Sequence, residues 1–298
     1  MNIGLNISFA VKRWMIPENL AAMISQDLFA KRIQFTWDII DPWWPEAKRD
    51  ALARRWAEAF RKEGLSIDSY FMGLGGYTYG QLLAPLQEQR EIAETFLRRA
   101  IDTALALGVK TIGMPLGGMS SEHANDPALR VQRYTSMLES LARLAEYARA
   151  QGTEKILIEA TPLLTEFPHS PGASLKLMKD LDGRTAIPIR LLVDWGHALF
   201  KPLLGAEADM SLWLKICAPY VDCLHLQQTD GLLDRHWDFT VDGIVSLDLI
   251  KQVAKETGSE GLVQYVEVIY PFEATDEVVL TGMKKTMSLL CSEGNDGR

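Results

Sequence analysis

The sequence predicts an α/β protein, a (β/α)8 TIM barrel built as a single domain. Short runs rich in Ile, Val and Leu alternate with longer segments of helical periodicity along all 298 residues. Such alternation is typical of a parallel sheet whose strands are covered on both faces. Eight strand–helix units in about 250 to 300 residues match a closed barrel.

An open, doubly wound sheet is the rival architecture, and it would place a glycine-rich phosphate loop after the first strand. Residues 9–14 follow that strand here and contain no glycine. No linker, low-complexity stretch or block of charge divides the chain. We therefore expect one barrel over residues 1–291, followed by a small, polar, frayed tail at 292–298.

In the first half, the helices are predicted from their ends and their apolar faces. Pro17 stands at a first-turn position, and Gly108 and Gly152 follow later helical segments as C-cap residues. The expected strands are Asn2–Ser8, Arg32–Asp38, Ser66–Met72 and Lys110–Pro115. The expected helices are Pro17–Phe29, Pro45–Glu63, Leu86–Leu107 and Pro127–Ala150.

In the second half, short apolar runs without alternation predict strands that are buried on both faces. The expected strands are Lys155–Ala160, Ile189–Asp194, Val221–Leu226 and Val263–Val268. The expected helices are Gly172–Asp180, Glu207–Ala218, Leu247–Thr257 (closed by Gly258) and Asp276–Leu290.

The composition narrows the classes of partner. With 31 basic and 39 acidic residues, the formal charge of −8 argues against binding nucleic acid over a broad surface. A local basic pocket for a phosphorylated substrate remains compatible with this charge.

No apolar run approaches 18 residues, and the N-terminus lacks a signal-peptide pattern. Three cysteines without a C-x-x-C pair indicate reduced thiols. We expect a cytoplasmic protein without membrane contact.

Polar side chains end four consecutive predicted strands, at the barrel face where active sites lie. These side chains are Glu159, Asp194, His225 and Glu267. Three carboxylates and one imidazole suit Mn²⁺, Mg²⁺ or Co²⁺, and a dication would offset their combined negative charge. Each residue alone would be explained by an ion pair or a buried hydrogen bond, but four in register favour one divalent metal site.

Other candidates flank this cluster. His197 follows Asp194 by three residues and is a candidate to bind a substrate oxygen or to orient a metal ligand. Arg235 and His236, in the loop after the seventh strand, are cationic candidates, as are Lys12 and Arg13 after the first. Ion pairs with Asp230 or Asp234, or a solvated loop, are the alternative interpretations.

Two loop features each allow more than one interpretation. Glycines at 73–80 and 117–121 would admit a ligand close to the backbone, supply positive φ angles or make flexible loops. The cluster Pro42–Pro45, with Trp14, Trp37 and Trp195, would line a site for a small polyol or pack the loops.

The sequence resembles the xylose-isomerase-like TIM-barrel superfamily of sugar isomerases and epimerases over nearly its whole length. The resemblance rests on 158–159, 193–197, 224–226 and 266–268, including the Asp-x-x-His element at Asp194 and His197. In the family's His-x-x-Glu element, which begins here at His225, Gln228 replaces Glu. Residues 2–14 and 41–45 look closest to the tetrulose-phosphate (erythrulose-phosphate) epimerase/isomerase branch of erythritol catabolism.

The resemblance implies one divalent metal held by Glu159, Asp194, His225 and Glu267, with Glu159 and Glu267 also serving as the acid/base pair. It implies epimerisation of a small ketose or ketose phosphate through a cis-enediolate, and a homo-oligomer.

An aldose–ketose isomerase and a polyol-ketone dehydratase are alternative functions that would share the same proton abstraction. A metal-dependent phosphodiesterase for damaged DNA fits poorly with five histidines and a charge of −8. A non-catalytic barrel would leave the strand-end cluster unexplained.

Overall fold

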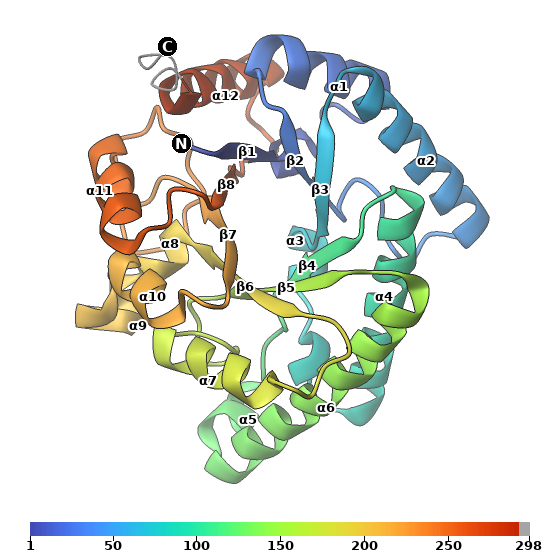
Figure 1. Cartoon of the computed structure of the whole chain (residues 1–298), viewed down its shortest axis with the longest axis vertical. Helices are drawn as coiled ribbons and strands as arrows, with labels where there is room; N and C mark the ends of the chain where they lie inside the picture. Colours follow the sequence, from blue (N-terminus) through green and yellow to red (C-terminus); the bar gives the residue numbers. More distant parts are fainter. Residues whose placement is uncertain (292–298) are drawn as a thin grey trace. The chain divides into compact units, whose positions relative to one another are not determined.

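The computed structural model describes residues 1–291, so the tail predicted at 292–298 lies outside the described residues. Eight parallel strands follow one another in the order β1 to β8 and close into a barrel, which confirms the predicted fold class (Figure 1). The strands are β1 (Ile3–Asn6), β2 (Arg32–Thr36), β3 (Ser66–Phe71), β4 (Thr111–Met114), β5 (Lys155–Ala160), β6 (Ile189–Asp194), β7 (Val221–Leu226) and β8 (Val263–Val266).

Strands β5, β6 and β7 have the bounds that the sequence predicts, because an apolar run in each ends at or beside a polar residue. The other strands are shorter than predicted. In β1, for example, the side chain of Asn6 accepts a hydrogen bond from the backbone N–H of Ser8 and begins the short helix η1 (Ile7–Ala10). The polar residue therefore ends the strand by capping the next element.

The helices that follow the strands lie close to their predicted positions. They are α1 (Pro17–Met23), continued by η2 (Ile24–Leu28), α2 (Glu46–Lys62), α4 (Gln87–Ala106), α6 (Pro127–Gln151), α7 (Pro171–Leu181), α10 (Met210–Cys217), α11 (Leu247–Thr257) and α12 (Asp276–Cys291). The sequence did not predict α3 (Leu74–Tyr77), α5 (Ser121–Asn125), α8 (Trp195–Ala198), α9 (Lys201–Leu204), η3 (Gln81–Leu83) or η4 (Gly205–Glu207). Segments of three to five residues are too short to show a helical period.

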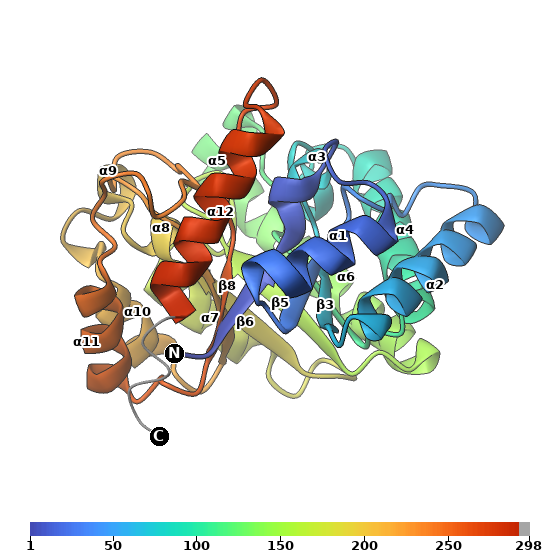
Figure 2. The same cartoon turned by 90° about the horizontal axis from the view of Figure 1, so that it is seen from above.

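Contacts within the chain define two compact units. The first comprises residues 1–35, 55–68 and 193–298, of which the structure describes those up to 291. In it, β8 pairs with β1 on one side and with β7 on the other, with Leu5 opposite Val266 and His225 opposite Tyr265. Helix α12 packs against η2, the continuation of α1 (Figure 2).

The second unit comprises residues 36–54 and 69–192. Its two glycine-rich loops approach each other closely. Gly117 has φ +92°, and a Cβ there would lie 2.2 Å from the carbonyl oxygen of Gly80. Of the interpretations that the sequence allowed, the structure supports a positive φ angle at Gly117 and close packing of the two loops.

In the same unit, Trp43 stacks on Phe96 of α4 with ring centroids 5.4 Å apart. The guanidinium of Arg99 lies over Trp43 and donates to the carbonyl oxygens of Pro42 and Trp44 at 2.9 and 2.8 Å. The aromatic loop after β2 is thus held against α4, as the loop-packing interpretation predicts. Among the described residues, no helix is both long and apolar enough to cross a membrane.

Candidate metal centre and active site

Asp194, the last residue of β6, uses its two carboxylate oxygens differently. Oδ1 accepts hydrogen bonds from the backbone N–H of His197 and from Nε2 of Gln227, both at 2.9 Å. Oδ2 is buried and has no hydrogen-bond partner within residues 1–291. A buried carboxylate oxygen without a donor is costly, and a cation would satisfy it.

The Asp-x-x-His element is explained by helix capping. Asp194 is the N-cap of α8, and the backbone N–H that it accepts belongs to His197. Between them, Gly196 lies against Gln227, since a Cβ on Gly196 would be 2.5 Å from the Cδ of that side chain. The absence of a side chain at 196 lets Gln227 reach the carboxylate of Asp194.

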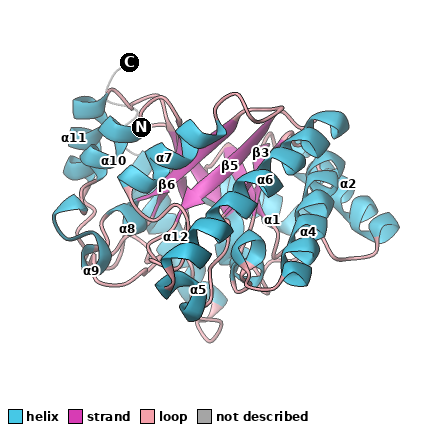
Figure 3. Cartoon of the chain, turned by 90° about the horizontal axis from the view of Figure 1, so that it is seen from below, coloured by secondary structure: helices cyan, strands magenta, loops and turns pink. Residues whose placement is uncertain are grey.

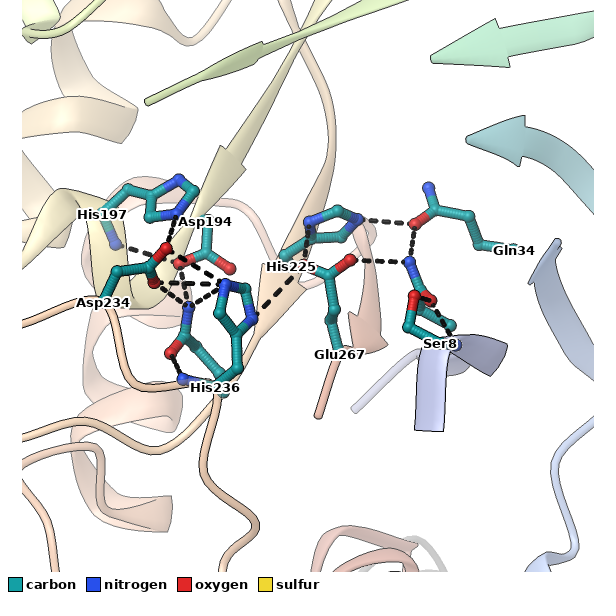
Figure 4. Close-up of polar contacts among 10 residues, drawn as sticks. Ser8, Gln34, Asp194, His197, His225, Asp234, His236 and Glu267 are labelled. Carbon is teal, nitrogen blue, oxygen red and sulfur yellow. Dashed lines mark hydrogen bonds and ion pairs between the residues drawn. The ribbon is translucent and has the colours of Figure 1, made fainter. Parts of the chain in front are cut away.

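His225, in β7, is held from both sides of its ring (Figure 4). Its Nε2 lies 2.6 Å from Oε1 of Gln34 in β2, and its Nδ1 lies 2.8 Å from Oε2 of Glu267, which directly follows β8. The sequence analysis did not single out Gln34, because a lone neutral amide within an apolar run gives no signal of its own.

A chain of hydrogen bonds fixes which way these amides point. Oδ1 of Asn6 accepts from the backbone N–H and the hydroxyl of Ser8, at 2.9 and 2.7 Å. Nδ2 of Asn6 must therefore be the donor to Oε1 of Gln34 (2.7 Å) and to Oε1 of Glu267 (2.9 Å). With Oε1 of Gln34 so placed, Nε2 of His225 carries a proton. Nδ1, which faces Oε2 of Glu267 and can donate to it in the metal-free protein, is the nitrogen that a metal would bind after displacing a proton.

The structure brings Asp194, His225 and Glu267 together. Each offers a ligand atom within 4.8 Å of the others, and all three are buried. Ligands about 2.0–2.6 Å from one hard cation can be at most about 4–5 Å apart. Burial alone would raise the pKa of Glu267, but the imidazoles of His225 and His236 lower it, so the carboxylate is the favoured form. These donors fit a divalent cation.

Glu159, the fourth predicted ligand, is buried one residue before the end of β5, in the second unit. Its position at the carboxyl end of the strand agrees with the sequence analysis. Its part in the metal centre stays a prediction.

A second group of possible ligands consists of His197, Asp234 and His236, whose ligand atoms also lie within 4.8 Å of one another. Oδ2 of Asp234 is 3.1 Å from Nε2 of His197, and Oδ1 is 3.1 Å from Nε2 of His236. Burial alone would raise the pKa of Asp234, but the two imidazoles lower it well below its usual range. Burial would lower the pKa of His236, but Asp234, followed by Glu267, raises it to about 9.

Asp234 was considered in the sequence only as a partner for the loop cations, and its contact with His197 was missed. Gln227 was missed as well. Its Nε2 also donates to Oδ1 of Asp234 at 3.0 Å, and its Oε1 accepts from the backbone N–H of His236. The Asp-x-His spacing at 234 and 236 was the signal that could have found this group.

Lys12 and Arg13, the first pair of predicted phosphate contacts, lie against the segment after β8. Arg13 donates to the carbonyl oxygens of Ala274 and Pro271, at 2.6 and 2.7 Å, and pairs with Asp276 at 3.1 Å. Lys12 has φ +65°, and its Nζ lies 4.3 Å from the ring centroid of Phe272. Arg13 therefore anchors this loop.

The second pair lies in the loop after β7. Arg235 contacts Oδ2 of Asp230 through Nε and Nη2, at 3.0 and 2.7 Å, and stacks over Trp237. The ion pair expected as the alternative is thus present. His236 is near Glu267, with Nδ1 3.6 Å from Oε2, so it joins the metal centre to the group around Asp234.

Gln228 occupies the position where the resembling family carries Glu, and it uses both ends of its amide. Oε1 accepts from the backbone N–H groups of Val245 and Thr229, at 2.9 and 3.0 Å, while Nε2 donates to the carbonyl oxygen of Val245 at 3.0 Å. A carboxylate could not make the last bond. Gln228, the residue that departs from the family pattern, therefore stabilises this loop through its hydrogen bonds.

Comparison with known proteins agrees with this fold. Residues 31–284 match the family model described as the xylose isomerase-like TIM barrel. The chain is 24% identical over 246 residues to D-erythrulose 1-phosphate 3-epimerase of Brucella abortus (strain 2308), covering 80% of this chain and 77% of that protein.

Two solved structures are similar over nearly the full length. A candidate xylose isomerase from Rhodospirillum rubrum ATCC 11170 is 46% identical with a TM-score of 0.96, covering 98% of this chain and 99% of that one. D-psicose 3-epimerase from Clostridium cellulolyticum H10 is 13% identical with a TM-score of 0.73, covering 97% and 98%. The latter similarity concerns the fold alone. By the family model and the 46% identical structure, the chain belongs to the xylose isomerase-like TIM-barrel family.

Proposed function

We propose that this protein is a metal-dependent epimerase or isomerase of a small ketose, with a tetrulose or its phosphate as the favoured substrate class. The observation that carries the proposal is the buried convergence of Asp194, His225 and Glu267, with Oδ2 of Asp194 lacking a protein donor. The curated relative, a D-erythrulose 1-phosphate 3-epimerase, supports the substrate class.

We propose Glu159 as the fourth metal ligand and, with Glu267, as the acid/base pair. A divalent cation (Mn²⁺, Mg²⁺ or Co²⁺) would act as a Lewis acid that stabilises negative charge on the substrate oxygens. The hydrogen-bond chain from Ser8 through Asn6 and Gln34 orients His225 and fixes Oε1 of Glu267. The oxygen Oε2 of Glu267 lies 2.8 Å from Nδ1 of His225, and we propose it as the oxygen that a metal ion would contact.

In the proposed reaction, one glutamate takes the proton from the carbon next to the carbonyl. The electron pair of that C–H bond forms the carbon–carbon double bond of a cis-enediolate, and the carbonyl oxygen gains the negative charge. The other glutamate, in its protonated form, gives its proton to the opposite face of the same carbon, so the carbonyl is restored and the configuration is inverted. Removal of a proton from the terminal CH2OH carbon instead, with return to the former carbonyl carbon and transfer of the hydroxyl proton to the former carbonyl oxygen, would give an aldose.

His197 has a positioning role in this scheme. Its backbone N–H fixes Asp194, and its ring faces Asp234 rather than an apolar wall. Asp234 also faces His236, which lies beside Glu267. We propose that this group holds hydroxyl groups of the substrate, because it places charged hydrogen-bonding side chains next to the metal ligands.

A phosphate on the substrate would have to be held by cations that already have contacts. Arg13 is committed to the loop after β8, and Arg235 is paired with Asp230. His236 is paired with Asp234, so Lys12, whose Nζ lies over the ring of Phe272, is the better candidate. A direct comparison of a ketose with its phosphate ester decides whether the phosphate contributes to binding.

The test is solvent deuterium incorporation, followed by NMR, in metal-loaded protein with erythrulose, erythrulose phosphate and longer ketoses. An epimerase would place deuterium on the carbon next to the carbonyl and form a new stereoisomer. An aldose product would identify an isomerase, and loss of a hydroxyl would identify a dehydratase. No label with any substrate and any of the three metals would refute the proposed chemistry.

Matched variants connect the result to the site. We expect Glu267→Gln and Glu159→Gln to abolish deuterium exchange, and Glu260→Gln, at an exposed position, to leave it unchanged. Persistence of exchange in Glu159→Gln would remove Glu159 from the acid/base pair. The homo-oligomer implied by the resemblance stays a prediction, which light scattering would test.

A further inference from the structure

Helices α4 and α6 lie side by side in the second unit (Figure 3). Their side chains line a cavity of about 500 Å³ that is partly open to solvent. None of the residues proposed for metal binding or catalysis lines it. Most of the lining is polar. The charged side chains that line the cavity are Arg90, Glu91, Glu94, Arg133, Glu139 and Arg143.

Arg133 is the unusual member of this set. It is only 5% exposed, and its Nε and Nη1 are buried without a hydrogen-bond partner in the described part of the chain. An unpaired buried guanidinium costs several kcal/mol, on the order of the penalty for other isolated buried ions. Because Arg133 lines the cavity, an oxyanion there would lie beside a guanidinium to which the described residues offer no carboxylate.

The six charged lining residues sum to zero formal charge, but the buried charge without an anionic partner is positive. Arg143 is bonded to Glu94, which removes one cation and one anion. Glu91 and Glu139 are exposed, so water screens them. Arg90 is half-buried, and its Nη1 donates to the carbonyl oxygens of Ala84 and Pro85 at 2.8 and 2.9 Å, which neutralises no charge.

Two further features favour an anion at this place. Gln87 lines the cavity and is the first residue of α4, a helix of 20 residues, so the positive end of that helix is nearby. Burial, and then the like charge of Arg133, lower the pKa of the Arg90 guanidinium, which indicates that the two cations lie close enough to repel each other. Ser136 and Thr135 add hydroxyl donors.

We propose that this cavity, lined by Arg133 and Arg90, is a binding site for the phosphate or carboxylate group of a small molecule. The guanidinium of Arg133 would form charge-assisted hydrogen bonds to the oxyanion after a side-chain rotation that exposes its buried nitrogens. The volume accommodates a small metabolite rather than a bare ion. The site is separate from the reaction described above and does not depend on it.

The experiment is calorimetric titration and thermal unfolding of the full-length protein with inorganic phosphate and, separately, with malonate, at constant ionic strength set by NaCl. The comparison is between the unaltered protein, Arg133→Met and Arg149→Met. Arg149 is an exposed arginine on the same helix, so its variant loses the same charge outside the cavity. Because R133M leaves the metal centre intact, anion binding at that centre is common to all three proteins and cancels.

We expect phosphate, malonate or both to bind the unaltered protein and R149M equally, and at least tenfold more weakly to R133M. We also expect R133M without anion to unfold at the same or a higher temperature, because it no longer buries an unpaired charge. The anion that binds more tightly identifies the chemical source, and either one supports the site.

A second measurement avoids any variant. In the unaltered protein, titration with phosphate or malonate should shift the backbone amide NMR signals of Gln87 and Arg133. Equal binding to the unaltered protein and R133M, or unchanged signals at both positions, would overturn the proposal. A change of oligomeric mass in R133M, without any anion response in the unaltered protein, would also overturn it and assign the cavity to a carboxylate of a second copy.

Discussion

Oε1 of Gln34 lies 2.6 Å from Nε2 of His225, although 191 residues separate them in the sequence. This contact sets the tautomer of His225, because Oε1 already accepts from Asn6 and can only be an acceptor toward the ring. The nitrogen that faces Glu267 is thereby the one that a metal would bind. Residues in β1 and β2 thus control a ligand in β7.

Removal of this acceptor should weaken metal binding. We expect Gln34→Leu to lower Mn²⁺ or Co²⁺ affinity by roughly 10- to 100-fold, as is typical of lost partners of ligating histidines. Gln34→Glu keeps an acceptor oxygen and should restore most of the affinity. Equilibrium dialysis with each metal measures this without any assay of turnover, and equal affinities in both variants would contradict the role of Gln34.

Gly196→Ala tests whether Gln227 supports Asp194. The added Cβ would lie 2.5–2.8 Å from side-chain atoms of Gln227, so that side chain must move away from Asp194 and His236. We expect metal affinity to fall by roughly 10- to 100-fold, because Asp194 would lose one of the hydrogen bonds that orient it. Gly172→Ala is the control, since nothing lies within 4 Å of its Cβ position in α7, and unchanged affinity in G196A would disprove the coupling.

Gln228→Glu restores the residue of the family pattern but should destabilise this protein. The buried Nε2 bond to Val245 would be lost and a carboxylate oxygen would face a carbonyl, at a cost of about 1–3 kcal/mol. We expect the apparent Tm to fall by several degrees. Gln26→Glu, an exposed substitution of the same kind, should leave it unchanged. An equally stable Q228E would show that the loop does not need the amide.

His236 should titrate near pH 9 in the metal-free protein. Asp234 is the main group that raises its pKa, against burial, which lowers it. A raised pKa stabilises the fold fully below the unfolded value of about 6.5, and that contribution is lost as the pH rises through about 9. NMR titration of the ring signals measures the pKa directly. Asp234→Asn should lower it, and a value at or below 6.5 in the unaltered protein would contradict the ion pair.

The sequence was enough to predict the barrel, because continuous apolar runs and helix-ending glycines recur in a regular order. The same runs located Asp194, His225 and Glu267, since each lies in or directly after a strand. Neutral amides carry no such signal. Gln34 and Gln227 became visible only when distant strands were brought together. The structure also showed that carbonyl oxygens of the loop after β8 bind Arg13, which the sequence did not predict, and that Arg235 forms the ion pair that the sequence offered as an alternative.

Asp194 combines a structural and a proposed chemical role in one side chain, because Oδ1 caps a helix while Oδ2, buried without a hydrogen-bond partner among the described residues, is a proposed metal ligand. A substitution of Asp194 intended to change the metal preference would therefore also disturb the fold. A glutamate or histidine there would have to supply a new helix start as well as a new donor atom. Redesign should begin instead at His225, whose supporting hydrogen bonds come from side chains that can be exchanged together with it.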